Sequence, residues 1–278
     1  MPIAETLILG AVKTVVLKLA SLGADQAVRL FDLTGKKRAF NHSIARLQSI
    51  GNVKTLWQID REISIYDFFV APRASHLESE FDLTTFAKLP KVGNLVIEGI
   101  LGQGKSIILR HMAISCMEDG LLPIFISAHT ITKTKSLKEK IREYLSDFSK
   151  REVTNEETAK LLDSTFFVLL IDGFDEVNPT EEASLIEEVQ SLSRRYDQSL
   201  RIIITSRPDN AIQKCTAFHI VKLCKLAPGE GNQLIQKLCD EHQARELISA
   251  LEKSGASGTK KPTNYTAYGG NSCDCLQR

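Results

Sequence analysis

The sequence has almost no excess of positive over negative charge, and it has few aromatic residues. Lys and Arg number 35 against 34 Asp and Glu, so the net charge is +1, and 6% of the 278 residues are aromatic. A chain without excess positive charge has no electrostatic reason to take nucleic acid or an anionic membrane as its main partner. With 43% hydrophobic and 25% charged residues, it has the composition of an ordinary globular protein.

Paired cysteines and long uncharged runs are also missing. Four of the six cysteines lie in apolar segments, and we interpret them as core side chains in a reducing compartment rather than as a disulfide framework. The apolar residues near the N-terminus are interrupted by Glu5, Lys13 and Lys18 and follow helical spacing. This pattern favours an amphipathic helix over a signal segment or membrane span. We therefore expect a cytoplasmic protein with no membrane span.

Hydrophobic patterning divides the chain into five segments. Residues 1–52 have helical spacing, whereas residues 53–90 contain one or two alternating strands and then a polar connection. Residues 91–229 carry five short apolar runs that alternate with helix-like stretches. Residues 230–253 predict one further helix. Residues 254–278 are rich in Gly, Ser, Thr and Asn without apolar periodicity, which predicts a disordered tail.

The third segment predicts the fold. Its five runs include "LLPIFIS", "TFFVLLID" and "LRIIITS", each four to seven residues without charge before a polar end. Such runs, separated by helices, are typical of parallel strands that are covered on both faces. Right-handed connections then give a doubly wound, mainly parallel five-stranded sheet with flanking helices. The predicted class is α/β with an added helical N-terminal region.

The clearest chemical signal follows the first run. The segment "GILGQGKS" matches the phosphate-binding pattern G-x-x-x-x-G-K-[ST] between a predicted strand and a predicted helix. Its three glycines let backbone N–H groups wrap an anion, and the helix directs its positive end to the same point. Lys105 adds a full charge for the β and γ phosphates, and Ser106 offers a hydroxyl to Mg²⁺. The predicted nucleotide-binding residues are Gly99, Ile100, Leu101, Gly102, Gln103, Gly104, Lys105 and Ser106.

Three carboxylates gather where the third run ends. Asp172 is its last residue, and we expect it beside Ser106, holding Mg²⁺ through water. Asp175 or Glu176 can orient or deprotonate a water that attacks the γ phosphate, while the other is a solvated loop acid. The sequence does not decide between them, with a slight preference for Glu176. Arg207 follows the fourth run and can reach the terminal phosphate from the same edge.

Three motifs in this order resemble the NACHT family of signal-transducing NTPases: "VIEGILGQGKS", "LLIDGFDEV" and "IIITSRP". The Asp-Gly-Phe-Asp-Glu segment is the most specific of them, and "ISIYDFFVAP" resembles the strand that such proteins place before the nucleotide fold. The resemblance covers roughly residues 55–230. The "GQGKS" variant is more similar to bacterial members.

The resemblance implies a P-loop NTPase of the STAND class. It implies ATP, or less often GTP, bound with Mg²⁺ and hydrolysed slowly as a switch in signal transduction. It also implies homo- or hetero-oligomers formed through the NTPase domain, in innate immunity or antiphage defence. Residues 230–253 resemble only the start of the family's helical subdomain, and His242 comes too early to be the nucleotide-sensing histidine. We therefore expect a truncated product, with a natural short form as the alternative.

Two other functions stay open at this point. A chain without the family's lid could be a nucleotide-binding adaptor or inhibitor with little turnover, assembling with a full-length relative. A nucleotide-dependent kinase or an AAA-type motor is a third reading. The sequence favours it less, because it shows no separate acceptor site and no arginine that can be assigned to act on a neighbouring subunit.

Overall fold

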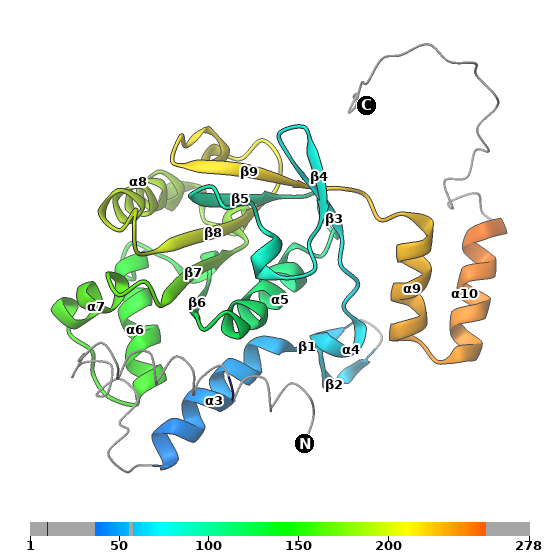
Figure 1. The fold of residues 1–278 in the computed structure, drawn as a ribbon, viewed down its shortest axis with the longest axis horizontal. Helices are drawn as coiled ribbons and strands as arrows, with labels where there is room; N and C mark the ends of the chain where they lie inside the picture. The colour runs from blue at the N-terminus through cyan, green and yellow to red at the C-terminus, as the bar shows by residue number, and fades with distance from the viewer. Residues whose placement is uncertain (1–9, 11–36, 56–57, 254–278) are drawn as a thin grey trace.

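The computed structural model describes residue 10, residues 37–55 and residues 58–253 (Figure 1). The predicted helix at the extreme N-terminus and the predicted tail at 254–278 lie outside these residues. Helix α3 (Lys37–Gly51) agrees with the predicted helical N-terminal region. No helix of the described part of the chain is long and apolar enough to cross a membrane.

The core is a seven-stranded sheet in the order β4-β3-β9-β5-β8-β7-β6. The five strands from β9 to β6 are parallel, as predicted. All six residues of β7 are buried, as are most of those in the strands beside it, which explains their uncharged sequences. The parallel strands are β5 (Asn94–Glu98), β6 (Leu122–Ser127), β7 (Phe167–Asp172), β8 (Arg201–Ser206) and β9 (Phe218–Leu223).

Helices cover both faces of this sheet (Figure 1). The chain passes from β5 outward to β6 and then back through β7 to β8. Right-handed connections therefore put α5 on one face and α6, α7 and α8 on the other, which confirms the doubly wound arrangement. The helices are α5 (Lys105–Glu118), α6 (Leu137–Ser149), α7 (Asn155–Leu162) and α8 (Pro179–Arg195); short 3₁₀ turns are η1 (Phe86–Lys88), η2 (Ala128–Thr130), η3 (Phe174–Glu176) and η4 (Ala211–Lys214).

The segment before the core contains two strands, which agrees with the one or two predicted there, but the second is shorter than expected. Strands β1 (Asn52–Thr55) and β2 (Gln58–Ser64) form a separate hairpin, and the expected strand in "ISIYDFFVAP" instead ends at Ser64. Helix α4 (Ile65–Phe68) follows because its two terminal residues, three apart, are buried on one side.

The expected polar connection forms two strands. Strands β3 (Arg73–His76) and β4 (Ser79–Asp82) extend the sheet antiparallel beyond β9. In this hairpin only Ala74 is fully buried, so the hydrophobic pattern that marks a strand is absent at this edge.

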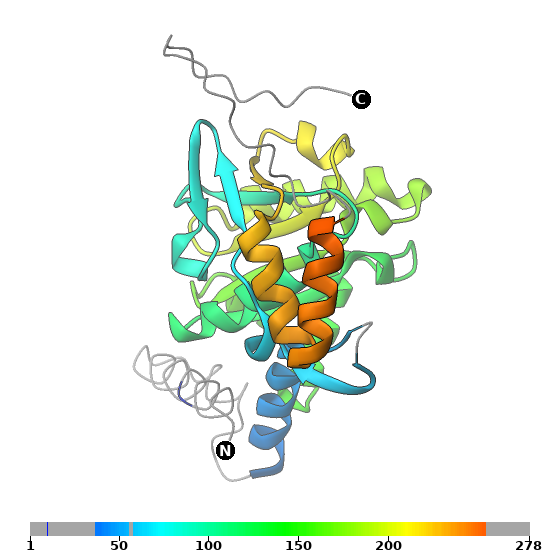
Figure 2. The same cartoon turned by 90° about the vertical axis from the view of Figure 1, so that its right-hand side faces the viewer.

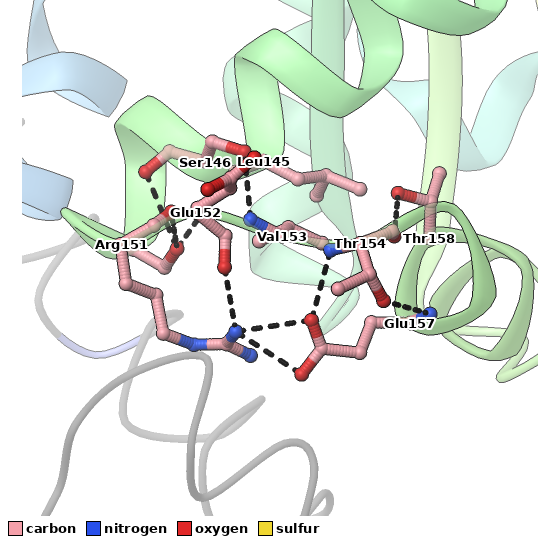
Figure 3. Close-up of polar contacts among 9 residues, drawn as sticks. Leu145, Ser146, Arg151, Glu152, Val153, Thr154, Glu157 and Thr158 are labelled. Atoms are coloured by element: carbon pink, nitrogen blue, oxygen red, sulfur yellow. Dashed lines mark hydrogen bonds and ion pairs between the residues drawn. The ribbon is translucent and has the colours of Figure 1, made fainter.

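Helix α7 was not predicted from the sequence, and it follows a tight turn after α6. Thr154 and Glu157 form a capping box that starts α7, with the Thr154 amide donating to Glu157 at 2.9 Å (Figure 3). Arg151 Nη1 donates to the same carboxylate at 3.1 Å and to the carbonyl of Glu152 at 3.0 Å. These bonds fix a tight turn between two helices.

Residues 230–253 belong to two helices rather than one. Helices α9 (Pro228–Leu238) and α10 (Glu241–Lys253) lie side by side (Figure 2). The break occurs at Asp240, because its side chain caps the start of the second helix. Asp240 Oδ1 accepts a hydrogen bond from the Gln243 amide at 2.9 Å. Lys237 of α9 donates to the Phe69 carbonyl at 2.9 Å and so ties the pair to the segment before the core.

One buried histidine makes stability depend on pH. The His111 ring on α5 stacks on Phe69 with centroids 3.6 Å apart, and its Nε2 lies 2.8 Å from the Thr84 carbonyl oxygen. Its Nδ1 is buried without a hydrogen-bond partner in the described structure. Burial lowers the pKa of His111, and the bond to Thr84 only partly opposes this.

We expect the free energy of unfolding to fall as pH drops through the range where an unfolded histidine, with a pKa of about 6.5, takes up a proton. The unfolded chain binds that proton more readily than the folded one, so acid favours unfolding. His111→Gln should unfold in urea with a smaller loss of stability between about pH 7.5 and pH 5.5. Equal losses in the two proteins would contradict this role.

Candidate functional site

A pocket of about 280 Å³ opens at the carboxyl ends of β5, β7 and β8. This is the edge where parallel α/β sheets gather ligands. The lining contains both basic and acidic residues that come from three separate sequence motifs: Leu101, Gly102, Gly104, Lys105, Ser106, Ile107, Asp172, Gly173, Asp175, Glu176, Thr205 and Arg207.

The loop after β5 has the backbone of an anion cradle. Gly102 and Gly104 have φ angles of 80° and 77°, which is the left-handed region that favours glycine. A Cβ at Gly99 would lie 2.8 Å from Gln103 Oε1 and 3.0 Å from Leu223 Cδ1, so a larger residue would have to displace these side chains. Gln103 Oε1 also accepts a bond from the Ile100 amide at 2.6 Å, which fixes the start of the loop. Helix α5 begins immediately after the loop, and its N-terminus lies at the pocket.

Lys105 is held by the loop that it follows. Its Nζ donates to the Gly99 carbonyl at 2.8 Å and to the Ile100 carbonyl at 3.1 Å. Burial is the largest cause of the lowered pKa of Lys105; Asp175 opposes the shift and Arg207 adds to it. An anion in the pocket would favour the charged ammonium.

Asp172 is fixed by a buried threonine. Its side chain ends β7, the residue is 9% exposed, and its Oδ1 accepts a bond from the Thr205 hydroxyl at 2.7 Å. The same hydroxyl accepts a bond from the Gly173 amide at 2.8 Å. Thr205 itself is fully buried on β8, the strand between the phosphate loop and Asp172. The sequence reading missed Thr205, since only the strand order shows that it separates the two motifs.

The two later acids have different surroundings. Asp175 Oδ2 lies 2.7 Å from Arg207 Nε, and Asp175 Oδ1 accepts a bond from the Arg207 amide at 3.1 Å. The arginine that was expected to reach a phosphate is thus paired with a carboxylate in this structure. Glu176 has a 56% exposed side chain, and its Oε2 lies 3.8 Å from His129 Nδ1. His129 is a second residue that the sequence reading missed.

The oxygens in the pocket suit a magnesium ion that is bound mainly by a nucleotide. The Asp172 carboxylate and the Ser106 hydroxyl line the same pocket, and Mg²⁺ prefers such hard oxygen ligands. Across the described residues there is no cluster of three or more His, Cys, Asp or Glu side chains that could hold a metal alone. The remaining ligands would be water and phosphate.

His242 is a surface residue. It lies on α10 with an 83% exposed side chain, 3.8 Å from Glu246 one turn away. Of the four cysteines interpreted as core residues, Cys116 and Cys215 are free and buried as expected, whereas Cys224 and Cys239 are only partly buried. Arg194 and Arg195 are exposed at the end of α8.

The Thr205 bridge should contribute measurably to stability. Thr205→Val keeps the shape but leaves a buried carboxylate and the Gly173 amide without their shared partner, which should lower the free energy of unfolding by about 1–3 kcal/mol. Thr205→Ser retains the hydroxyl and is the matched control. Urea unfolding that gave the same stability for both variants would show that the bridge has no energetic role.

Comparison with known proteins identifies the family. The NACHT domain model matches residues 94–242, more than half of the chain. Domain III of the Thermotoga maritima replication initiation protein DnaA is similar at 18% identity and a TM-score of 0.35, covering 55% of this chain and 63% of that one. A DNA replication initiation factor is similar at 15% identity and a TM-score of 0.38, covering 62% and 59%. The chain thus spans less than two thirds of either structure.

Comparison with curated proteins found no match. The family assignment therefore depends on the domain match, and the fold agrees with it: the matched residues begin at the first residue of β5 and contain the phosphate loop, the acidic end of β7 and all five parallel strands. The chain belongs to the NACHT family, and its central domain is an α/β P-loop NTPase.

Proposed function

We propose that this protein binds ATP or GTP together with Mg²⁺ and hydrolyses it slowly as a switch in signal transduction. NACHT membership already implies nucleotide binding and hydrolysis. The observation that carries the finer proposal is that Lys105, Ser106, Asp172, Glu176 and Arg207 line one pocket although they come from three distant motifs.

Each residue has a proposed role that follows from its surroundings. The loop amides and Lys105 hold the phosphates, with Lys105 exchanging its bonds to loop carbonyls for bonds to phosphate oxygens. Ser106 and Asp172 hold Mg²⁺, which neutralises charge on the phosphates. Glu176 orients the attacking water, since its carboxylate is exposed whereas that of Asp175 is bound to Arg207.

The Asp175–Arg207 pair supports a low intrinsic rate. An arginine that stabilises charge on the transferring phosphoryl group contributes about 10³–10⁵ to kcat. Arg207 is the one arginine that lines the pocket in the described structure, and Asp175 occupies it at 2.7 Å. Arg207 would sense the terminal phosphate only after leaving Asp175. A switch of this kind changes state slowly unless a partner accelerates it.

The phosphate loop is connected to the region after the sheet. Gly99 packs against Leu223, the last residue of β9, and the chain then runs directly into α9 and α10. A change in the loop can therefore change how this helix pair is held. We propose that nucleotide state controls homo- or hetero-oligomer formation through the NTPase domain, in the cytoplasm, with roles in innate immunity or antiphage defence.

A second candidate is a nucleotide-binding adaptor or inhibitor with little turnover, which assembles with a full-length relative. One observation favours it. Both cations of the pocket are already satisfied by the chain itself, Lys105 by loop carbonyls and Arg207 by Asp175. Such a site can bind nucleotide without reaching a geometry that allows hydrolysis.

Lys105→Ala should weaken binding of a labelled ATP analogue by about 10–100-fold, because a charge-assisted bond to phosphate contributes about 1.5–3 kcal/mol. Lys160→Ala, which removes an exposed lysine on α7, is the matched control and should bind as the wild type does. Equal affinities for all three proteins would refute the assigned phosphate site.

Phosphate release distinguishes the switch from the adaptor. The wild type should release phosphate slowly and only with Mg²⁺, and Asp172→Asn should lower the rate by about tenfold or more, since it removes charge that holds the metal. Asp197→Asn, at the opposite edge of the sheet, is the control. Phosphate release at background level from both the wild type and Asp172→Asn would favour the adaptor function.

A further inference from the structure

The turns that follow β6 and β7 bring a histidine to the proposed water-orienting acid. The two strands are parallel neighbours, and Ser127 pairs in register with Asp172 at their ends. The chain then forms η2 after β6 and η3 after β7, and these two turns pack against each other. His129 in η2 therefore lies beside Glu176 in η3.

The Glu176 carboxylate is partly exposed and has two close neighbours, His129 and Gly173. His129 Nδ1 lies 3.8 Å from Glu176 Oε2 and 2.8 Å from the Ser127 hydroxyl oxygen, which fixes the ring. On the other side, a Cβ at Gly173 would lie 3.0 Å from Glu176 Oε2, and the φ of 72° at Gly173 favours glycine, so a larger residue there would displace the acid. His129 is not among the residues that line the pocket, so it reaches the site through Glu176.

The other charged groups near this contact have partners of their own. Lys133 and Lys135 of the same loop pair with Glu181 on α8 at 4.0 Å and Glu143 on α6 at 3.2 Å. Across the pocket, Arg207 pairs with Asp175, and Lys105 donates to the carbonyls of its own loop. Among the described residues, His129 supplies the one ion pair to Glu176.

We propose that His129 is a positioning residue that controls Glu176 through its charge. This inference rests on the proposed function. In hydrolysis the water oxygen bonds to the terminal phosphorus, the bond from that phosphorus to the bridging oxygen breaks, and the proton of water passes to Glu176. A charged imidazole holds the carboxylate at the side of the pocket and makes it a weaker base. An uncharged imidazole releases it.

Histidine changes charge between about pH 5 and 8, so the device makes turnover depend on pH. Loss of the His129 charge raises kcat with little change in nucleotide affinity, because His129 does not line the pocket. Protonation keeps the nucleotide bound and unhydrolysed. A mildly acidic environment would thus prolong the triphosphate-bound state of the switch.

Two substitutions set the charge permanently and test this directly. His129→Gln is uncharged and His129→Lys is charged throughout the range; kcat for phosphate release and the Kd of a fluorescent ATP analogue are measured for both and for the wild type from about pH 6 to pH 8. The wild-type kcat should rise from about pH 6 to pH 8. The kcat of His129→Gln should be high, and that of His129→Lys low, throughout this pH range. The Kd of the ATP analogue should be similar for all three proteins.

A wild-type pH profile in His129→Gln, or equal kcat for the Gln and Lys variants, would overturn the inference. So would a Kd that changed equally in both variants, since that indicates a merely structural role. In a Glu176→Gln background the difference between the two His129 variants should vanish, and its persistence would also overturn the inference. Absence of release from the wild type would refute the proposed hydrolysis as well, whereas release with an unchanged profile refutes only the role of His129.

Discussion

Negative charge at the end of β7 is the constraint on which the rest of this site depends. Asp172, Asp175 and Glu176 lie within five residues, and their repulsion must be balanced by nearby donors and cations. The fold gives each acid its own partner: Thr205 for Asp172, Arg207 for Asp175 and His129 for Glu176. None of these partners is adjacent in sequence, so the acidic cluster is stable only in the folded sheet. The pocket that results is poised for a further cation and an anion together, which is the chemistry of a magnesium nucleotide.

Strand order explains how these partners meet. Strand β8 lies between the strand that precedes the phosphate loop and the strand that ends in Asp172. Its last residues contact both sides, since the Gly99 amide donates to the Ser206 carbonyl at 3.1 Å and the Thr205 hydroxyl donates to Asp172. The end of β8 therefore connects the phosphate loop to the acidic residues, so a nucleotide-dependent change in either one can affect the other. The same segment continues into Arg207, so a group that can sense the terminal phosphate is attached to this bridge.

The sequence predicted the features that a local pattern encodes. Largely uncharged runs located four of the five parallel strands because strands buried on both faces exclude charge, whereas β9 was located by its short apolar run although it contains Lys222 and is only partly buried. The glycine pattern located the phosphate loop because close backbone approach requires it. The edge hairpin β3–β4 was not predicted because few of its side chains are buried and its buried and exposed residues do not alternate clearly. The partners of the acids could not be predicted, since Thr205 and His129 become neighbours of the site only through strand order and register. The roles of the site residues remain predictions that the geometry supports.

The most direct test of a shared magnesium–nucleotide site is backbone hydrogen exchange with and without ATP and Mg²⁺. Binding at the proposed site should slow exchange at the amides of residues 99–106, which would donate to phosphate, and at those of residues 172–176 beside the metal. Amides on α7, away from the pocket, should exchange equally in both states. Unchanged exchange in both segments at saturating nucleotide, or protection confined to another part of the protein, would contradict the account.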